Sequence, residues 1–318
     1  MFTLVGCVCL LISLPIQAVQ NPSGPLSKDF QLWLDRNGYG KYNFARLEFG
    51  TEGSYGGKKR SSDQIKNTPV IFIHGNSDGA LANGDKYGTG WSSSIAHFLK
   101  NGFQPSELYA TTWSDRDPEN SFQRTHNCKD LLFLRRFIQA VLQYTGAKRV
   151  NIIAHSMGVT MARPLIKGIF VSQHDGESCV LGSPISHRID KFIAIAGANY
   201  GLCVCSSKRM LVFGSCNQYN GFWPGFSSDQ CTAHSNDTTA IGEYSRLLQD
   251  TNENKIKEAS NTFAIWSTKD EIVINKNLVY GRHTSAYPTM DEKMEFNDLS
   301  HMETKDATVD LQMQWIRQ

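Results

Sequence analysis

The middle of this chain alternates short apolar runs with longer amphipathic stretches, and this alternation limits its possible folds more than any other feature. Runs suited to buried strands occur at 70–75, 107–113, 149–154, 191–198 and 262–268, with a weaker run at 293–296. Helical patterns occupy 93–102, 128–146, a stretch from 157, 243–248 and a last segment ending at 315. Strands that alternate with helices at this spacing form a parallel sheet covered on both faces. The sequence therefore predicts an α/β fold with a mostly parallel sheet.

The beginning of the chain has the pattern of a targeting segment. Residues 2–14 are nearly all apolar, and Ile16-Gln17-Ala18 offers a small residue at a cleavage point, although no positive residue precedes the run. The run is too short to span a bilayer comfortably, and no other segment of the sequence is long and apolar enough to do so. We therefore predict a signal peptide at 1–18, a secreted protein and a single domain at 19–318.

Cysteine usage agrees with export. Removal of Cys7 and Cys9 with the signal peptide leaves an even number of cysteines, which favours disulfides in an exported chain but leaves their pairing open. The remaining ones are Cys128, Cys179, Cys203, Cys205, Cys216 and Cys231. A zinc site is a poorer interpretation, because Cys203 and Cys205 lack the two-residue gap of a zinc knuckle and a partner pair. Asn236 begins an Asn-Asp-Thr acceptor, so we predict a glycoprotein.

Composition and charge exclude two classes of function. The net charge is +2, and the only short basic run is 58–60, in a glycine- and serine-rich loop, so nucleic-acid binding is not expected. The glycine-rich runs at 50–57 and 79–90 match neither phosphate-binding loop pattern, which argues against nucleotide binding.

The stretch "NIIAHSMGV", residues 151–159, places a Ser-x-Gly step directly after a strand candidate and before a helix. A catalytic serine needs such a sharp turn, and the residues two before and two after it must be small. Gly158 meets this requirement, and Ala154 adds one methyl group where glycine is usual. Ser156 could instead be a helix N-cap. The strand-turn-helix setting favours a nucleophile at Ser156.

Acyl transfer also needs two backbone N–H groups that face the developing oxyanion. Met157, directly after the serine, supplies the first candidate. Asn76 supplies the second, because it follows the strand candidate "VIFIHG" and Gly75 lets the loop turn tightly. We interpret His74 and His155 as structural histidines.

The base and its acid should follow the serine in the order acid, then histidine. Only His301 has a strand candidate before it and a helix after it, which distinguishes it from the histidines at 174, 187, 234 and 283. Asp270 ends the strand candidate "TFAIWST" and so lies at the carboxyl edge of the sheet. Glu271 is its closest rival as the acid, and Asp298 is a weaker one.

The order of these motifs resembles the class 2 lipases of the α/β-hydrolase superfamily. The matching pieces are "VIFIHGN", "TGAKRVNIIAHSMG", "IAGAN", "WSTKDEIV" and "LSHM", which span about 69–302. The core is similar to that of small secreted bacterial lipases with Ala-His-Ser-Met-Gly at this turn. The resemblance implies an α/β-hydrolase fold and no cofactor.

The same resemblance assigns site residues and a substrate class. It implies Ser156 as nucleophile, Asp270 as acid and His301 as base, with the N–H groups of Asn76 and Met157 as the oxyanion hole. It favours Asp270 over Glu271, and it implies a lipid ester or a lipid–water interface as the partner.

The chain departs from the smallest relatives at 19–68 and at about 200–239. The second segment is a cysteine-rich insertion that contains the aromatic run "NQYNGFWPGFSS". It could be a flap that uses Tyr219, Phe222, Trp223 and Phe226 to cover the site or to touch lipid. We favour a stapled loop that packs its aromatic side chains inward.

We therefore expect a secreted serine ester hydrolase, a lipase that cleaves acylglycerols or related lipid esters through an acyl-enzyme. Two alternatives remain open at this point. One is a soluble carboxylesterase or amidase with the same triad. The other is a secreted binding protein of the same fold that has lost catalysis. The sequence does not indicate whether the protein forms oligomers.

Overall fold

The structure, a computed structural model, describes residues 21–225, 231 and 244–318, and its centre is a seven-stranded sheet. The strand order is β1-β3-β2-β4-β7-β8-β11. The bounds are β1 Ser54–Tyr55, β2 Val70–Ile73, β3 Leu108–Thr111, β4 Val150–His155, β7 Ile189–Ile195, β8 Asn261–Ser267 and β11 Glu292–Phe296. Only β1, at one edge, pairs antiparallel. The predicted mostly parallel sheet is confirmed.

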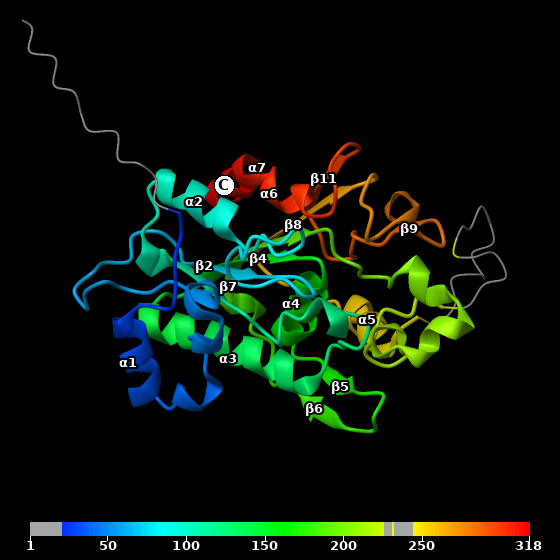
Figure 1. Cartoon of the computed structure of the whole chain (residues 1–318), viewed down its shortest axis with the longest axis horizontal. Coiled ribbons are helices and arrows are strands. Elements are labelled where there is room, and N and C mark those ends of the chain that lie inside the picture. Colours follow the sequence, from blue (N-terminus) through cyan, green and yellow to red (C-terminus); the bar gives the residue numbers. More distant parts are fainter. Residues whose placement is uncertain (1–20, 226–230, 232–243) are drawn as a thin grey trace, which may run out of the picture.

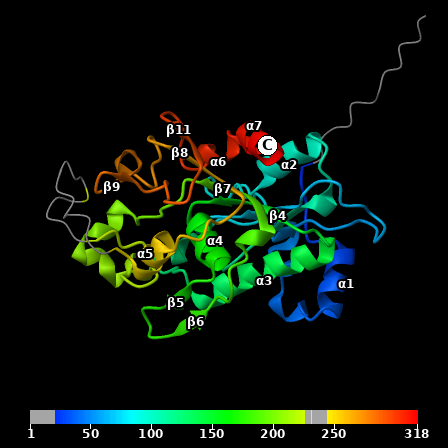
Figure 2. The same cartoon turned by 180° about the vertical axis from the view of Figure 1, so that it is seen from behind.

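Helices cover both faces of this sheet (Figures 1 and 2). One face carries α2 (Ser92–Lys100) and α7 (Val309–Arg317). The other face carries α1 Lys28–Arg36, α3 Cys128–Thr145, α4 Met157–Lys167 and α5 Arg246–Glu253. A short helix, α6 (Glu303–Asp306), precedes α7. The predicted two-sided α/β architecture is therefore confirmed.

The strands in the middle of the sheet are mainly apolar because they bury both of their faces, whereas the edge strand β11 is largely exposed. In β2, Ile71 and Ile73 belong to the core cluster under α3 and α4, whereas Val70 and Phe72 belong to the cluster under α2 and α7. Successive side chains of a strand point to opposite faces, so a sheet covered on both sides needs apolar residues at every position. This burial holds the carboxyl ends of the strands rigidly at one edge.

Helix ends follow the local signals of the sequence. Ser27 caps α1, and its hydroxyl accepts a hydrogen bond from the N–H of Phe30 at 3.2 Å. Gly146 ends α3 in the left-handed conformation, with a φ of 66°. The helix expected at 243–248 begins later, at Arg246, and continues to Glu253.

Several short elements were not expected. They are the antiparallel pairs β5 Phe170–Ser172 with β6 Ser178–Val180 and β9 Leu278–Val279 with β10 Arg282–His283, and the edge strand β1. Short 3-10 helices also connect the main elements: η1 Gly40–Tyr42, η2 Leu47–Glu52, η3 Pro105–Glu107, η4 Pro118–Asn120, η5 Ser186–Arg188 and η10 Asn275–Asn277. Strands of two or three residues are too short to show a periodic pattern.

The insertion after β7 is built from tight turns and disulfides. Its described part contains the 3-10 helices η6 Cys203–Ser206, η7 Lys208–Val212 and η8 Gly214–Cys216. Two disulfides, Cys203–Cys231 and Cys205–Cys216, brace it, and a third, Cys128–Cys179, joins the start of α3 to β6. The disulfide prediction is therefore confirmed, and the pairing that the sequence left open is now defined.

Some expectations fall on parts of the chain for which no structure is described. The signal peptide at 1–18, the glycan acceptor Asn236 and the aromatic ring of Phe226 lie outside the described residues, and the division into 1–18 and 19–318 stays a prediction. Among the residues that the structure does describe, no helix combines the length and the apolar character needed to cross a bilayer.

Candidate active site

Ser156 lies at the junction of β4 and α4, in the sharp turn that the motif predicts. Its φ of 54° and ψ of −127° are strained for a residue with a side chain. The residue occupies the N-cap position of α4, but its side chain makes no capping hydrogen bond. Its backbone N–H instead donates to the carbonyl of Ile195 in β7 at 2.8 Å. This geometry counts against the N-cap alternative and leaves the hydroxyl available.

Close backbone approaches explain the small residues around this turn. A Cβ atom at Gly158 would lie 2.4 Å from the carbonyl oxygen of His74 and 2.5 Å from that of Ile73. A Cβ atom at Gly75 would lie 2.8 Å from the Cβ of Ser156. Ala154 is fully buried in β4, where its methyl group packs in the core beneath α3 and α4. The departure from glycine at this position is therefore accommodated.

His301 and Asp270 are brought together at the same edge of the sheet. His301 Nδ1 donates a hydrogen bond to Asp270 Oδ2 at 2.7 Å, and both side chains are buried. Because the carboxylate can only accept, Nδ1 carries a proton, and in the neutral form of the ring Nε2 therefore has the free lone pair. The N–H groups of Ile272 and Val273 donate to Asp270 Oδ1 at 2.9 and 2.8 Å. The carboxylate is thus held on both oxygens.

The environment of Asp270 favours its charged form. Burial on its own raises the pKa of this carboxyl group, but the hydrogen bond and charge of His301 and the two backbone N–H groups outweigh burial, so the net pKa lies below its ordinary value. A carboxylate that stays ionised can orient the imidazole and stabilise its protonated form.

The two rival carboxylates occupy other positions. Glu271 Oε2 accepts a hydrogen bond from the backbone N–H of His301 at 2.9 Å, so it contacts the main chain of the histidine and Asp270 contacts the ring. Asp298 is exposed, and its backbone carbonyl accepts a hydrogen bond from Lys269 Nζ at 3.2 Å. Of the three, Asp270 alone has the geometry of a histidine-orienting acid.

His74 and His155 are buried residues that bond to the backbone. The Nδ1 and Nε2 atoms of His74 lie 2.7 Å from the Gly75 carbonyl oxygen and 3.0 Å from the Trp113 nitrogen. His155 Nε2 lies 3.1 Å from the carbonyl oxygen of His301, a contact that the sequence did not indicate. Burial lowers the pKa of His74 to about 3 and that of His155 well below its ordinary value, so both stay neutral at pH 7.

A buried ion pair, also missed from the sequence, links the histidine segment to the loop after β2. Lys305 Nζ lies 3.1 Å from Asp78 Oδ2, and both side chains are almost fully buried. The N–H groups of Gly79 and Gly90 each donate to Asp78 Oδ1 at 2.8 Å. Removing either charged partner would leave an uncompensated charge in the interior. This pair therefore fixes the loop that carries Asn76 against the segment that carries His301.

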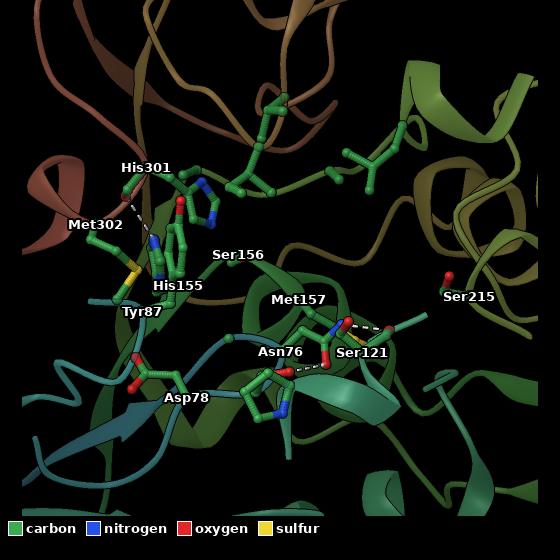
Figure 3. Close-up of a pocket in the computed structure, with 18 of the residues that line it drawn as sticks. Asn76, Asp78, Tyr87, Ser121, His155, Ser156, Met157, Ser215, His301 and Met302 are labelled. Atoms are coloured by element: carbon green, nitrogen blue, oxygen red, sulfur yellow. Dashed lines mark hydrogen bonds between the residues drawn. The ribbon is translucent and has the colours of Figure 1, made fainter. Parts of the chain in front are cut away.

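Two residues that line the cavity beside the serine have unpaired backbone N–H groups among the described residues. The N–H groups of Asn76 and Met157 have no hydrogen-bond acceptor within the described part of the chain. Both residues line the same cavity as Ser156 and His301 (Figure 3). Unpaired amide donors at a helix N-terminus and an adjacent loop can stabilise a negatively charged oxygen.

The cavity has a volume of about 580 Å³ and two different walls. Sheet-edge loops form the first wall, which contains Asn76, Ser156, Met157 and His301. The cysteine-rich insertion forms the second wall through Leu202, Val204, Cys205, Ser215, Cys216 and Phe222. A cavity of this size accommodates a small organic ligand or an acyl chain.

The insertion combines both interpretations that its sequence allowed. Phe222 and Trp223 are buried, as a self-packed loop requires, whereas Tyr219 is 51% exposed. Phe222 also lines the cavity, so the segment forms part of the site as well as packing inward. Within residues 21–225, 231 and 244–318, no cluster of three or more His, Cys, Asp or Glu side chains could hold a metal ion.

Comparison with known families decides the class of this site. A family model described as Lipase (class 2) matches residues 67–314, which is most of the chain and includes Asn76, Ser156, Met157, Asp270 and His301. The chain belongs to the class 2 lipase family. The predicted resemblance and the α/β-hydrolase fold are thereby confirmed, and this class 2 lipase is a carboxylic ester hydrolase in general terms.

Solved structures similar to this lipase are distant in sequence. The Pyrococcus furiosus esterase Pf2001 shares 15% identity over 79% of this chain and 81% of its own, with a TM-score of 0.45. A Bacillus licheniformis lipase in its mature form shares 13% identity over 83% and 97%, with a TM-score of 0.46. An extracellular α/β-hydrolase from a Paenibacillus species shares 11% identity over 79% and 100%, with a TM-score of 0.45.

Proposed function

We propose that this class 2 lipase is a secreted enzyme that cleaves acylglycerols or related lipid esters, with Ser156 as nucleophile, His301 as base and Asp270 as its orienting acid. One observation carries the proposal. The buried hydrogen bond between His301 and Asp270 lies beside the same cavity as a serine whose backbone is strained and whose hydroxyl caps no helix. Strain of this kind accumulates at functional sites.

The proposed reaction is acyl transfer in two steps. Ser156 Oγ attacks the ester carbonyl carbon while His301 Nε2 takes the hydroxyl proton, and the carbonyl oxygen becomes an oxyanion between the N–H groups of Asn76 and Met157. The tetrahedral intermediate then expels the alkoxide, which takes the proton from Nε2 and leaves as the alcohol. A water molecule repeats the sequence on the acyl-enzyme and releases the carboxylic acid.

The surroundings of the cavity support a lipid substrate. Five apolar or aromatic side chains line the cavity and are also between 40% and 51% exposed: Tyr87, Phe122, Val204, Ile272 and Ile274. Exposed apolar groups that gather around one opening are typical of a surface that meets an apolar partner. We therefore propose a lipid–water interface as the partner of this face.

Secretion is supported by the cysteines. The described residues contain three disulfides, and disulfides persist mainly in oxidising compartments. This observation agrees with the proposed signal peptide at 1–18. Recovery from the medium of a chain that begins after Ala18 would support this part of the proposal, whereas an uncleaved cellular protein would contradict it.

Replacement of the serine tests the proposed chemistry. We expect Ser156→Ala to fold with an unchanged melting temperature and to lose about 10⁶-fold in kcat, because knockouts of a triad nucleophile reach this size. The purified wild-type protein and the variant should both be assayed on a soluble ester and on the matching anilide amide. Ordinary ester turnover by the folded variant would contradict the proposal, and faster cleavage of the amide would identify an amidase.

A rate profile over acyl chain length separates a lipase from an esterase. The profile should be measured below and above the solubility limit of each ester. We expect the rate to rise when the substrate forms an interface, because apolar side chains surround the cavity opening. A smooth preference for short, soluble esters would identify a carboxylesterase instead.

A further inference from the structure

The side chain of Asn76 is held at both of its polar ends. Its Oδ1 accepts a hydrogen bond from Arg124 Nη1 at 2.7 Å, and its Nδ2 donates to the carbonyl oxygen of Ser121 at 2.9 Å. Neither end is therefore free to turn toward the cavity, and the backbone N–H is the donor that remains. The position of that N–H depends on the groups that hold the side chain.

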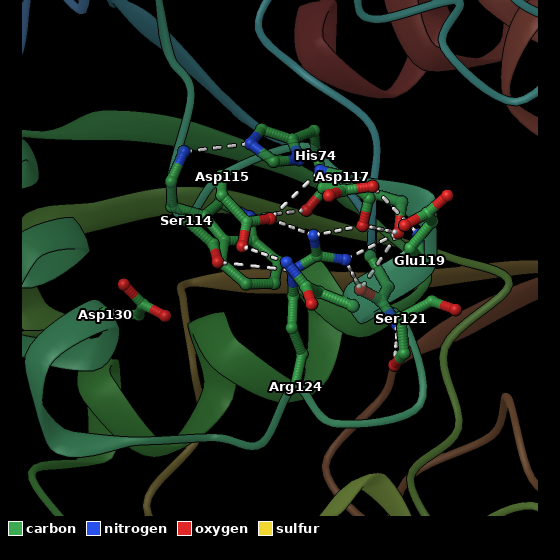
Figure 4. Close-up of polar contacts among 12 residues, drawn as sticks. His74, Ser114, Asp115, Asp117, Glu119, Ser121, Arg124 and Asp130 are labelled. Atoms are coloured by element: carbon green, nitrogen blue, oxygen red, sulfur yellow. Dashed lines mark hydrogen bonds and ion pairs between the residues drawn. The ribbon is translucent and has the colours of Figure 1, made fainter.

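Arg124, which bonds to this asparagine, also contacts Ser114 and Asp115 in the loop that follows β3 (Figure 4). Its Nη1 also donates to Ser77 Oγ at 2.6 Å, and its Nε donates to Ser114 Oγ at 3.2 Å. Its Nη2 contacts the carboxylate of Asp115 and the backbone carbonyl of Asp117. The arginine side chain is 5% exposed, so these contacts form away from bulk water. A planar guanidinium with fixed donor directions holds such acceptors in one arrangement.

The two turns that Arg124 joins contain strained backbone. Ser77, Ser114 and Arg116 have φ values of 60°, 58° and 62°, and none of them is glycine. Conformations of this kind persist only where the surrounding structure imposes them. The contacts of Arg124 with the hydroxyl groups of Ser77 and Ser114 supply part of that restraint.

We propose that Arg124 is a positioning residue that sets the N–H of Asn76 for the oxyanion. The inference rests on the proposed function, because it assumes that this N–H is an oxyanion donor. A donor to a developing charge must be held within a fraction of an ångström of its productive position. Arg124 provides this restraint through the asparagine side chain, although Arg124 does not itself line the cavity.

The Arg124→Lys variant tests the proposal. Lysine keeps the charge but cannot donate in several fixed directions. We expect kcat to fall about tenfold to a hundredfold, somewhat less than the loss of a whole oxyanion donor, with KM within about twofold of wild type. The rates should be divided by the amount of Ser156 that an alkyl phosphonate titrates at its end point, so that misfolded protein does not count.

Arg135→Lys is the matched control. Arg135 is 5% exposed and donates to two backbone carbonyls, those of Leu165 and Ser183, but it lies outside the cavity. The same substitution there should change stability without changing kcat per titrated serine. If Arg124→Lys and Arg135→Lys have the same kcat within about twofold, Arg124 is a structural brace and the proposal is overturned.

The Asn76→Ala variant keeps the proposal testable if Arg124→Lys does not fold. It removes the two side-chain anchors and keeps the backbone N–H, so it should lose kcat to a similar extent at unchanged KM. Where Arg124→Lys does fold, the double variant should be no slower than Asn76→Ala alone, because Arg124 would then have no asparagine to position. Wild-type turnover by Asn76→Ala, or losses that multiply in the double variant, would overturn the proposal.

Failure of this inference is distinguishable from failure of the proposed function. If Ser156→Ala abolishes turnover and Arg124→Lys retains it, only the role of Arg124 is wrong. If Ser156→Ala retains turnover, the nucleophile itself is wrong, and the oxyanion donor that Arg124 would position loses its function.

Discussion

The two walls of the cavity are built in different ways. Buried strands and polar contacts hold the sheet-edge wall, where Asp270 fixes the ring of His301 and Arg124 holds the side chain of Asn76. The described part of the insertion wall has three short 3-10 helices and two disulfides in place of sheet contacts. The groups proposed for chemistry lie on the first wall, and Leu202, Val204 and Phe222 give the second its apolar surface. We therefore expect the sheet-edge wall to control turnover and the insertion wall to control which substrates fit.

The largest expected effect concerns the sheet-edge wall. Asp270→Asn should lower kcat about 10³-fold to 10⁴-fold, because an amide at this position no longer selects the tautomer with a free Nε2. Kinetics on a short soluble ester would measure the loss. Glu271→Gln is the matched control, since its amide oxygen can still accept from the N–H of His301, and we expect less than a tenfold loss. A loss below tenfold for Asp270→Asn would mean that Asp270 is not the orienting acid.

An intermediate effect is expected when the insertion wall is loosened. The double variant Cys205→Ala with Cys216→Ala should lose about 2–3 kcal/mol of unfolding free energy, as expected for a short disulfide loop. Turnover of a short ester should stay within about threefold of wild type, whereas long-chain esters should fall about tenfold because both cysteines line the cavity. Urea unfolding and the chain-length profile measure the two effects.

This variant also tests whether the two walls act independently. If short-ester turnover fell as far as in Asp270→Asn, the insertion would be needed for the catalytic geometry itself. The separation of turnover from substrate fit would then be wrong.

The smallest expected effect is a difference in acid stability. The pKa of Asp270 in the folded protein is lowered, with burial opposing the shift and the contacts of His301 outweighing it. When folding lowers the pKa of a carboxyl group, its ionised form stabilises the folded protein above the unfolded-state pKa of about 4. This stabilisation is lost as the pH falls through the folded-state pKa. The unfolding free energy of Asp270→Asn should therefore fall less steeply between about pH 5 and pH 2 than that of wild type.

Urea unfolding at several pH values measures this slope. The cysteine double variant should keep the wild-type slope, because the disulfide that it removes does not titrate in this range. Equal slopes for wild type and Asp270→Asn would show that the pair of Asp270 and His301 adds no stability at neutral pH.

The sheet-edge wall could be predicted from the sequence because its signals are local. The turn at Ser156 follows from a strand, a small residue and a helix in succession, and Asp270 follows from the end of a strand. The choice between Asp270 and Glu271 needed the family resemblance, since adjacent carboxylates differ only in the direction of their side chains. The structure separates them by their contacts with the ring and the backbone of His301.

The insertion wall and the anchors of the loops could not be predicted in this way. The cysteine spacing allowed several pairings, and only the folded chain brings Cys203 to Cys231. Arg124 and Asn76 are 48 positions apart, and neither lies in a periodic pattern. Contacts of this kind depend on how loops meet after the sheet has formed, and local propensity contains no information about them.

The central claim is that Ser156 is the nucleophile of the site. Mass spectrometry of the purified protein after reaction with an alkyl phosphonate ester tests it most directly. We expect one phosphonyl group per chain, located on Ser156, with loss of ester turnover in proportion to labelling and no labelling of Ser156→Ala. Labelling on another residue, or full activity after Ser156 is labelled, would contradict it.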